Sequence, residues 1–409
     1  MTMRFDATSR DLAERLFRSI GAGTRDSRGI TRPSYGHGES FALHGIRLEA
    51  IAHGLVAETD RAGNLIMTID GAPKEPVVLV GSHLDSVPEG GNYDGLAGVI
   101  AALLVLIEAK KRGSVAPIAG IGFRGEESAW FGTPYVGSRA ALGLLEFPAP
   151  RPDGTSLKEA MRAVGADVDA IEKKERLLFD TLDVGEFWEL HIEQGPVLVD
   201  VEIPVGVVDA IRGNVRAPSA RVLGKAGHSG TTPHAGREDA VLRFAQMLTG
   251  MDEDRAWVHE RGRDVTLTCG IVGTVPGKHA MTTIADEVRF SMDVRSVDPD
   301  VLDFMVTSLR EWNEYVDWGG FVRTPPAEMS PEMIARAIAA ADRLGVPYFK
   351  MPSGAGHDAA TFAGTGISSG MIFVRNENGS HNPDEMMDMD DFMLGVEVLY
   401  EAIQRRGSQ

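Results

Sequence analysis

The sequence of 409 residues contains a single cysteine, Cys269, so no disulfide can form within the chain. Disulfide scaffolds belong to oxidising compartments, and a chain without them is expected in a reducing cytoplasm. Cys269 lies in a stretch of strand-like character, where we expect a small buried side chain rather than a reactive thiol. The cysteine content therefore excludes a disulfide-stapled secreted protein and predicts a cytoplasmic one.

Long apolar runs and basic runs are missing as well. The longest apolar run, Leu96–Ile107, is too short to cross a bilayer, and residues 1–6 show no apolar core followed by a cleavage site. Acidic residues number 59 against 41 basic ones, which gives a net charge of -18. Neither a membrane nor a nucleic acid is therefore expected as a partner. The remaining composition is that of a globular protein, and 409 residues predict two domains.

One loop gathers polar side chains between two apolar segments. The run Val77–Val80 predicts a buried strand of a parallel sheet, and Leu96–Ala109 predicts a long helix. His83, Asp85 and Asp94 lie between them among several glycines. His83 could bind a metal ion through one ring nitrogen while Asp85 accepts a hydrogen bond from the other, and Asp94 could supply a second ligand. Because turns also favour Asp and Gly, this loop alone leaves an ordinary turn as an equal alternative.

Two adjacent glutamates follow a second predicted strand, Ile118–Phe123. Consecutive side chains at a strand end point to opposite sides, so Glu127 could ligate a metal while Glu126 faces a substrate as a general base. An acidic loop in an acidic protein is the alternative.

Histidines stand near the ends of other apolar strands, where a buried core histidine is the usual explanation. His191 lies near the end of one such strand, and His381 follows the strand Met371–Val374. Open α/β sheets place their ligands at the carboxyl edge, so these side chains would meet there. Three histidines and two carboxylates suit a pair of divalent ions bridged by Asp94. The predicted ligands are His83, Asp94, Glu127, His191 and His381.

Between residues 212 and 325 the predicted strands no longer read as continuous apolar runs, and their side chains alternate in polarity instead. This is typical of a sheet with one exposed face, and helices near 237–249 and 298–315 would cover the other face. We therefore predict an inserted α+β domain at 212–325, and an α/β domain with a mixed sheet made of 1–211 and 326–409. The predicted strands of the insertion include Ala220–Lys225, Asp264–Cys269 and Glu287–Arg295.

Taken together, these motifs resemble the hydantoinase/carbamoylase branch of the dinuclear metal-dependent amidohydrolases, which are related to aminoacylases and carboxypeptidase G. That branch includes N-carbamoyl-L-amino-acid hydrolases, β-ureidopropionases and allantoate amidohydrolases. The resemblance covers nearly the whole chain. Its blocks, in order, are Gly81–Asp85, Gly91–Gly95, Glu126–Glu127, Glu189–Pro196, Ala226–Pro233, Ser353–Ala359 and Ser380–His381.

The resemblance implies a dinuclear metallopeptidase-like catalytic domain whose inserted domain serves as a dimerisation and lid domain. It implies two divalent ions per subunit, zinc or manganese first, with cobalt or nickel as alternatives. The same five residues are the implied ligands, with Asp94 shared. Glu126 is the implied general base, Asp85 the orienting partner of His83, and His228 an oxyanion-stabilising residue that crosses a homodimer. The implied substrate-binding residues are Gln194, Thr282, Arg295, His357 and Gly379.

The implied activity is hydrolysis of a linear amide or ureide C–N bond in a small carboxylate-bearing molecule, an N-carbamoyl amino acid or a related ureide. Thr282 stands where the family often has an asparagine that helps to bind the substrate carboxylate, and His279 and His234 also depart from the family pattern. The substrate therefore stays open. An N-acyl amino acid deacylase or dipeptidase on the same metals is one alternative, and a catalytically silent binding or dimerisation protein is another.

Overall fold

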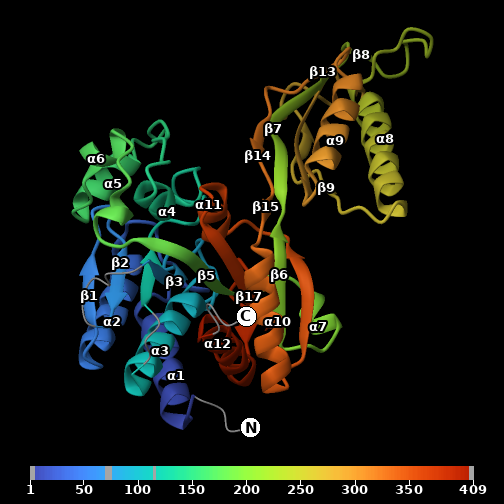
Figure 1. The fold of residues 1–409 in the computed structure, drawn as a ribbon. Coiled ribbons are helices and arrows are strands. Elements are labelled where there is room, and N and C mark those ends of the chain that lie inside the picture. Colours follow the sequence, from blue (N-terminus) through green and yellow to red (C-terminus); the bar gives the residue numbers. More distant parts are fainter. Residues whose placement is uncertain (1–4, 70–75, 114–116, 405–409) are drawn as a thin grey trace. The chain divides into compact units, whose positions relative to one another are not determined.

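The computed structural model describes residues 5–69, 76–113 and 117–404 (Figure 1). The chain divides into two compact units, one formed by Met1–Asp209 with Met329–Gln409 and the other by Ala210–Glu328. Each unit has a hydrophobic core of its own. We call them the sheet unit and the inserted unit.

A mixed β-sheet forms the centre of the sheet unit, in the strand order β1-β2-β4-β3-β5-β17-β6, with β16 pairing β6. The neighbours β4, β3, β5 and β17 run parallel to one another, while β1, β2 and β6 run antiparallel to their neighbours. This confirms the predicted mixed-sheet α/β fold. The strands are β1 (Val56–Thr59), β2 (Leu65–Thr68), β3 (Val77–His83), β4 (Ile118–Phe123), β5 (Val184–Ile192), β6 (Val205–Ile211), β16 (Tyr348–Ser353) and β17 (Ser368–Val374).

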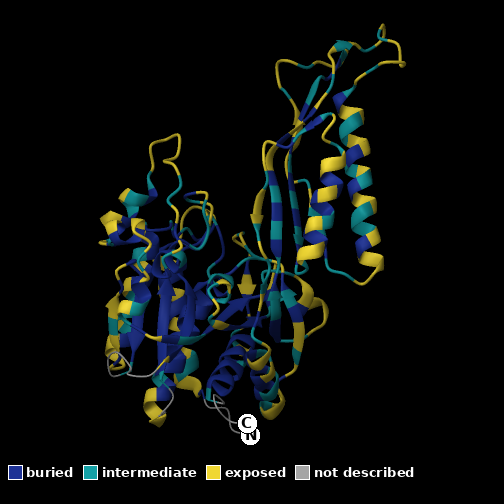
Figure 2. Ribbon diagram, turned by 45° about the horizontal axis from the view of Figure 1, so that its top comes forward, coloured by how far each residue is buried: buried dark blue, intermediate teal, exposed yellow. Residues whose placement is uncertain are grey.

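Helices cover both faces of this sheet. The helices α1, α2, α3, α10 and α12 share one continuous core with it, and on the opposite face Phe362 of α11 stacks on Phe187 with ring centroids 4.2 Å apart. The central strands are buried on both faces (Figure 2), which explains their continuous apolar sequence. These helices are α1 (Ala7–Gly23), α2 (His37–Ala52), α3 (Leu96–Arg112), α10 (Pro331–Leu344), α11 (Asp358–Gly364) and α12 (Met389–Gln404).

Two local predictions for the sheet unit need correction. The Gly-, Ser- and Arg-rich segment 22–39 predicts a loop that includes His37, but His37 is the first residue of α2, and the N-cap is Gly36, which offers no side chain to signal a helix start. The charged region 150–183 predicts helix, and the structure has helix there only in short pieces, one of which ends before Gly165 at φ 87°. The short elements around the sheet are α4 (Val136–Ala141), α5 (Leu157–Ala163), α6 (Val168–Glu172), the 3₁₀ helix η1 (Leu177–Asp180), α7 (Val197–Asp200), β18 (Asn376–Glu377) and β19 (Met386–Met387).

The inserted unit is an antiparallel sheet in the order β10-β12-β7-β13, with β14 on β7 and β9 on β12. Burial alternates along β12, and the buried side chains pack with those of α8 and α9. The helix predicted at 237–249 is α8, which runs on to Glu260. The elements are β7 (Gly213–Leu223), β8 (Gly227–His228), α8 (Ala240–Glu260), β9 (Thr266–Thr268), β10 (Val272–Thr274), β11 (Thr283–Ile284), β12 (Glu287–Ser296), α9 (Pro299–Glu311), β13 (Val316–Asp317), β14 (Val322–Thr324) and β15 (Ala327–Glu328).

Among the described residues, no helix combines the length and the apolar character needed to cross a membrane.

Candidate metal centre

The carboxyl ends of the four parallel strands of the sheet unit bring polar side chains to one edge. His83 is the last residue of β3, and His191 is the penultimate residue of β5. Asp94 lies just before α3, Glu127 follows β4, and His381 follows β17. Three separate stretches of chain therefore meet the β3–α3 loop at this edge, as parallel strand polarity requires.

His83, Asp94 and His191 form the first group that could hold a metal ion. Oδ1 of Asp94 lies 3.2 Å from Nε2 of both histidines, and the two Nε2 atoms are 3.4 Å apart. This carboxylate oxygen is buried and accepts no hydrogen bond. Two imidazole nitrogens and a carboxylate oxygen that converge in this way fit a cation.

The hydrogen bonds of the other ring nitrogens set the tautomers of these histidines. Nδ1 of His191 lies 2.9 Å from the carbonyl oxygen of Ile192, and Nδ1 of His83 lies 3.2 Å from the carbonyl oxygen of Asp85. Because a carbonyl only accepts, each Nδ1 must donate, so each ring in its neutral form carries its lone pair on Nε2. A neutral ring would thus direct a ligating nitrogen to the point that it shares with Oδ1 of Asp94.

Asp94, Glu127 and His381 form a second group. Nε2 of His381 lies 3.6 Å from Oδ2 of Asp94 and 3.4 Å from Oε1 of Glu127. Hydrogen bonding to Glu127 raises the pKa of His381 to about 9, so a cation entering this group must displace a proton. The two oxygens of Asp94 thus face two different groups, and the five predicted ligands lie together.

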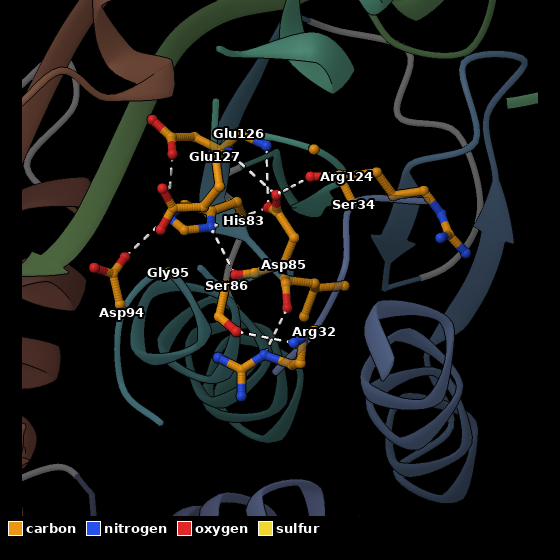
Figure 3. A network of polar contacts seen from close by, with 12 residues as sticks. Arg32, Ser34, His83, Asp85, Ser86, Asp94, Gly95, Arg124, Glu126 and Glu127 are labelled. Carbon is orange, nitrogen blue, oxygen red and sulfur yellow. Dashed lines mark hydrogen bonds and ion pairs between the residues drawn. The ribbon is translucent and has the colours of Figure 1, made fainter. Parts of the chain in front are cut away.

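Glu126 belongs to neither group but lies beside the first one (Figure 3). Its Oε2 is 3.9 Å from Nε2 of His83. Burial, with the nearby charges of Glu127 and Asp358, raises the pKa of Glu126 well above its usual range against the opposing effect of His83. A buried carboxylate with a raised pKa is suited to accept a proton.

Asp85 has more partners than the sequence suggested. Its Oδ1 lies 3.3 Å from Nδ1 of His83, but the hydrogen-bond acceptor for that nitrogen is the Asp85 carbonyl. The carboxylate instead accepts the backbone N–H groups of Glu126 and Glu127, at 3.0 and 3.1 Å, and the Ser34 hydroxyl at 2.6 Å. Asp85 therefore holds the glutamate loop as well as lying against His83.

Two glycines and a strained glutamine shape the loops around these groups. Gly95 has φ 66°, and a Cβ there would lie 2.4 Å from the His83 ring, so only glycine fits. Gln194, at φ 65°, donates from Nε2 to Oδ2 of Asp94 at 2.7 Å. Asn376 accepts the backbone N–H of Gln194 and donates to the carbonyl of Gly379. Of the predicted substrate-binding residues, Gln194 and Gly379 therefore lie together near Asp94.

His357 is fully buried behind the first group. Its ring centroid is 4.6 Å from that of His191, and its Nε2 lies 2.9 Å from the Ser353 hydroxyl. Burial lowers the pKa of His357 well below its usual range, so the ring is neutral. Together with Glu189 and His191, His357 forms a third group of possible metal-ligating atoms.

Glu385 is a site residue that the sequence did not reveal. Its Oε1 accepts the backbone N–H groups of Tyr93 and Asp94, at 2.8 and 3.3 Å, and its Oε2 accepts the Ser380 hydroxyl at 2.8 Å. It thereby ties the loop that carries His381 to the loop that carries Asp94. An acidic residue four positions after a histidine in a polar loop carries no distinctive signal.

The other predicted residues lie in the inserted unit. His228, on β8, is exposed and opposes Thr283 of β11. The carbonyl of Thr282 accepts the backbone N–H of Ser229 at 2.9 Å. Arg295, on β12, donates from Nη2 to Oδ2 of Asp293 at 2.9 Å. A substrate carboxylate at Arg295 would compete with Asp293.

Comparison with known proteins agrees with these motifs. An N-carbamoyl-L-amino acid amidohydrolase of Geobacillus stearothermophilus is 35% identical over 410 residues, covering 96% of this chain and 97% of that protein. An allantoate amidohydrolase of Escherichia coli (strain K12) is 31% identical, covering 92% of this chain and 93% of that one. The crystal structure of a hydantoinase/carbamoylase family amidase from Burkholderia ambifaria has a TM-score of 0.80 at 28% identity, covering 98% of both chains.

Residues 79–405 match the model of peptidase family M20/M25/M40. This match spans the sheet edge and every predicted ligand. The resemblance drawn from the sequence motifs is thereby confirmed, and the chain belongs to peptidase family M20/M25/M40 and, within it, to the hydantoinase/carbamoylase branch.

Proposed function

We propose that this protein hydrolyses the linear C–N bond of a small carboxylate-bearing ureide, with N-carbamoyl-L-amino acids as the first candidates. The observation that carries the proposal is the pair of ligand groups sharing Asp94 with Glu126 beside them. The names of the relatives, which are amidohydrolases for N-carbamoyl-L-amino acids and for allantoate, support the substrate class.

His83, Asp94 and His191 would hold one divalent ion, and Asp94, Glu127 and His381 the other. Mixed nitrogen and oxygen ligands suit zinc or manganese, and cobalt or nickel as alternatives. Ions bound there supply Lewis-acid activation of the substrate carbonyl and of water. The unpartnered, buried Oδ1 of Asp94 supports this assignment, because a buried carboxylate oxygen without a donor is costly unless a cation meets it.

Glu126 acts as the general base in this proposal. It takes a proton from the attacking water and returns it to the leaving nitrogen as the C–N bond breaks. Hydrolysis of an N-carbamoyl amino acid thus releases the free amino acid and carbamate. The carbamate then decomposes to carbon dioxide and ammonia. Asp85 keeps Glu126 in place through its backbone N–H.

The remaining predicted residues would bind the substrate. Arg295 offers a guanidinium fork that suits a carboxylate, with Thr282 nearby in sequence. Gln194 and Gly379 would contact the acyl or ureido end, and His357 supports the pocket from behind His191. In a homodimer, His228 would reach the partner's site and stabilise the developing oxyanion.

A substrate panel on metal-reconstituted protein tests the proposal. N-carbamoyl-L-amino acids should be turned over, and N-acetyl amino acids and dipeptides should react at least about tenfold more slowly, because a pocket with polar groups placed for one end group rejects another. Each acid should be paired with its methyl ester. Equal rates for acid and ester would remove Arg295 from carboxylate recognition, and preferred turnover of dipeptides would replace the proposal with a dipeptidase.

A further inference from the structure

The loop that carries the two glutamates is held in two ways. The carbonyls of Arg124, Gly125 and Glu126 accept backbone N–H groups of residues 135–137, at 2.8 to 2.9 Å, and its own N–H groups donate to side chains. After β4 ends at Phe123, four consecutive backbone N–H groups each donate to a buried side-chain oxygen. The bonds are Arg124 N to Asn64 Oδ1 at 3.1 Å, Gly125 N to Glu39 Oε1 at 2.8 Å, Glu126 N to Asp85 Oδ1 at 3.0 Å and Glu127 N to Asp85 Oδ2 at 3.1 Å.

The N–H bonds bear on where the two carboxylates point. Adjacent residues outside a sheet have no ladder to fix their backbone dihedrals, so other acceptors must meet their N–H groups. Gly125 takes φ 64° at this point, and a Cβ there would lie 2.8 Å from the Tyr35 ring. On the N–H side of this loop, the backbone directions of Glu126 and Glu127 therefore depend on side-chain acceptors.

Much of this support comes from one short segment, residues 32–39, which we call the N-terminal brace; Figure 3 shows two of its residues, Arg32 and Ser34. Its Ser34 hydroxyl donates to Oδ2 of Asp85 at 2.6 Å. Its Glu39 accepts Gly125 N through Oε1 and pairs with Arg124 through Oε2. Both side chains are buried. The brace lies before residue 79, where the family match begins.

The brace also reaches the loop that carries His83 and Asp94. Arg32 is fully buried and donates from Nε to the carbonyl of Leu84 at 2.8 Å and from Nη1 to Oδ1 of Asn92 at 3.1 Å. The segment thus contacts two of the four stretches of chain that form the candidate metal centre. The acceptors that the structure describes for this guanidinium are neutral, so its charge is left to offset the nearby carboxylates of Asp85 and Asp94.

We propose that the N-terminal brace positions the catalytic glutamates, with Ser34 and Glu39 as positioning residues that act through Asp85 and the Gly125 backbone. Neither side chain touches the ligand groups. Their effect is to keep Glu126 directed at the reacting atoms and Glu127 at the second metal group. The role in turnover rests on the proposed function, whereas the effect on the loop backbone does not.

Two variants test the brace, each with a matched control. Ser34→Ala removes one donor to Asp85, and Ser308→Ala removes the hydroxyl of another buried serine, which donates to Asp254 in the inserted unit. Glu39→Gln leaves only one acceptor oxygen where the carboxylate has two. Its control is Glu108→Gln, which changes another buried glutamate that pairs with an arginine, Arg112 on α3. The controls reproduce the loss of a buried polar contact away from the glutamate loop.

Amide hydrogen exchange of the metal-free protein is the first measurement. In Ser34→Ala and Glu39→Gln, the amides of residues 125–127 should exchange about tenfold faster or more, because charge-assisted hydrogen bonds protect them. The second measurement is turnover of the metal-loaded protein. We expect kcat to fall about tenfold or more with KM changed less than about twofold, since a small misplacement of a catalytic group acts on the reacting state.

The brace is rejected if both variants show wild-type exchange at 125–127, or if the control variants lose kcat to the same extent. The exchange measurement needs no substrate. If no compound in the panel is hydrolysed, the proposed function fails, while exchange at 125–127 still decides whether the brace holds the loop.

Discussion

Glu126 and Glu127 are chemically identical neighbours with different surroundings. Glu127 lies 3.4 Å from His381 in the second ligand group, whereas Glu126 is buried beside His83 and belongs to no group. This difference in surroundings implies that the same substitution has different consequences at the two positions, for the metal content at Glu127 and for the rate at Glu126.

We predict that Glu126→Gln keeps both metal ions and still binds substrate, while kcat falls about 10²–10⁴-fold through loss of the general base. Glu127→Gln should instead lower the metal content, because a neutral amide is a weaker ligand than a carboxylate. Metal stoichiometry and kcat, measured on the same preparation, check this. Loss of metal in Glu126→Gln with retention in Glu127→Gln would reverse the two roles.

The sequence predicted which residues could act, but not what holds them. His83, Asp94 and the glutamate pair stood out because they follow apolar strands. Glu39 looks like an ordinary acidic residue in the first turn of a helix, where it is expected for capping. Its contact with Gly125 joins residues 86 positions apart, and no local pattern announces it.

At the scale of elements, Glu385 links the loop after β17 to the loop before α3. Glu385 bonds the N–H groups of Tyr93 and Asp94 and the hydroxyl of Ser380. Glu385→Ala should free this loop and reduce metal binding at the second group, so that about one ion per subunit remains. Its matched control is Asp384→Ala, an exposed acidic neighbour in the same loop.

Elemental analysis after gel filtration measures the outcome for both variants. Asp384→Ala should retain two ions. Two tightly held ions in Glu385→Ala would show that the loop keeps its place without this carboxylate.

Strands and helices could be predicted where their burial produces a simple pattern of apolar residues in the sequence. The buried strands β3 and β4 read as continuous apolar runs because both of their faces are covered. In the region 150–183 the breaks between helices were not predicted, because the helices are too short to show a 3.6-residue period. The start of α2 was predicted too late, because Gly36 caps it without a side-chain bond.

At the scale of the whole molecule, the two units have separate cores and all five candidate ligands lie in one of them. A metal ion that binds only the native state stabilises it by mass action, by about 2.7 kcal/mol when the free metal concentration is a hundredfold above Kd. We therefore predict two calorimetric transitions, of which only the one belonging to the sheet unit rises in Tm when metal is added.

The variant Met251→Ala assigns the transitions, since Met251 is fully buried in the core of the inserted unit. This substitution should lower the free energy of unfolding of the inserted unit by about 2–5 kcal/mol, and with it the Tm of the transition that does not respond to metal. A single transition that moves as a whole with metal and with Met251→Ala would mean that the units unfold together.

Mixed dimers test the proposed homodimer and the role of His228. Subunits with His228→Ala and subunits with Glu126→Gln should each be inactive alone. If each site takes its histidine from the neighbour, one site of the mixed dimer regains both groups and activity returns. Activity that stays absent in the mixture, with active wild-type controls treated alike, would place His228 outside the partner's site.

Asp94 joins one closed group of ligands to one open group. His83 and His191 have side chains only 2% and 1% exposed, whereas the His381 side chain is 51% exposed. The metal ion bound by the exposed group with His381 should therefore exchange with solvent before the ion bound by His83 and His191. Brief chelation should release one ion quickly and the other slowly, and refilling with a different metal should yield a mixed-metal protein. A time course of metal release with a single fast phase for both ions would contradict this order.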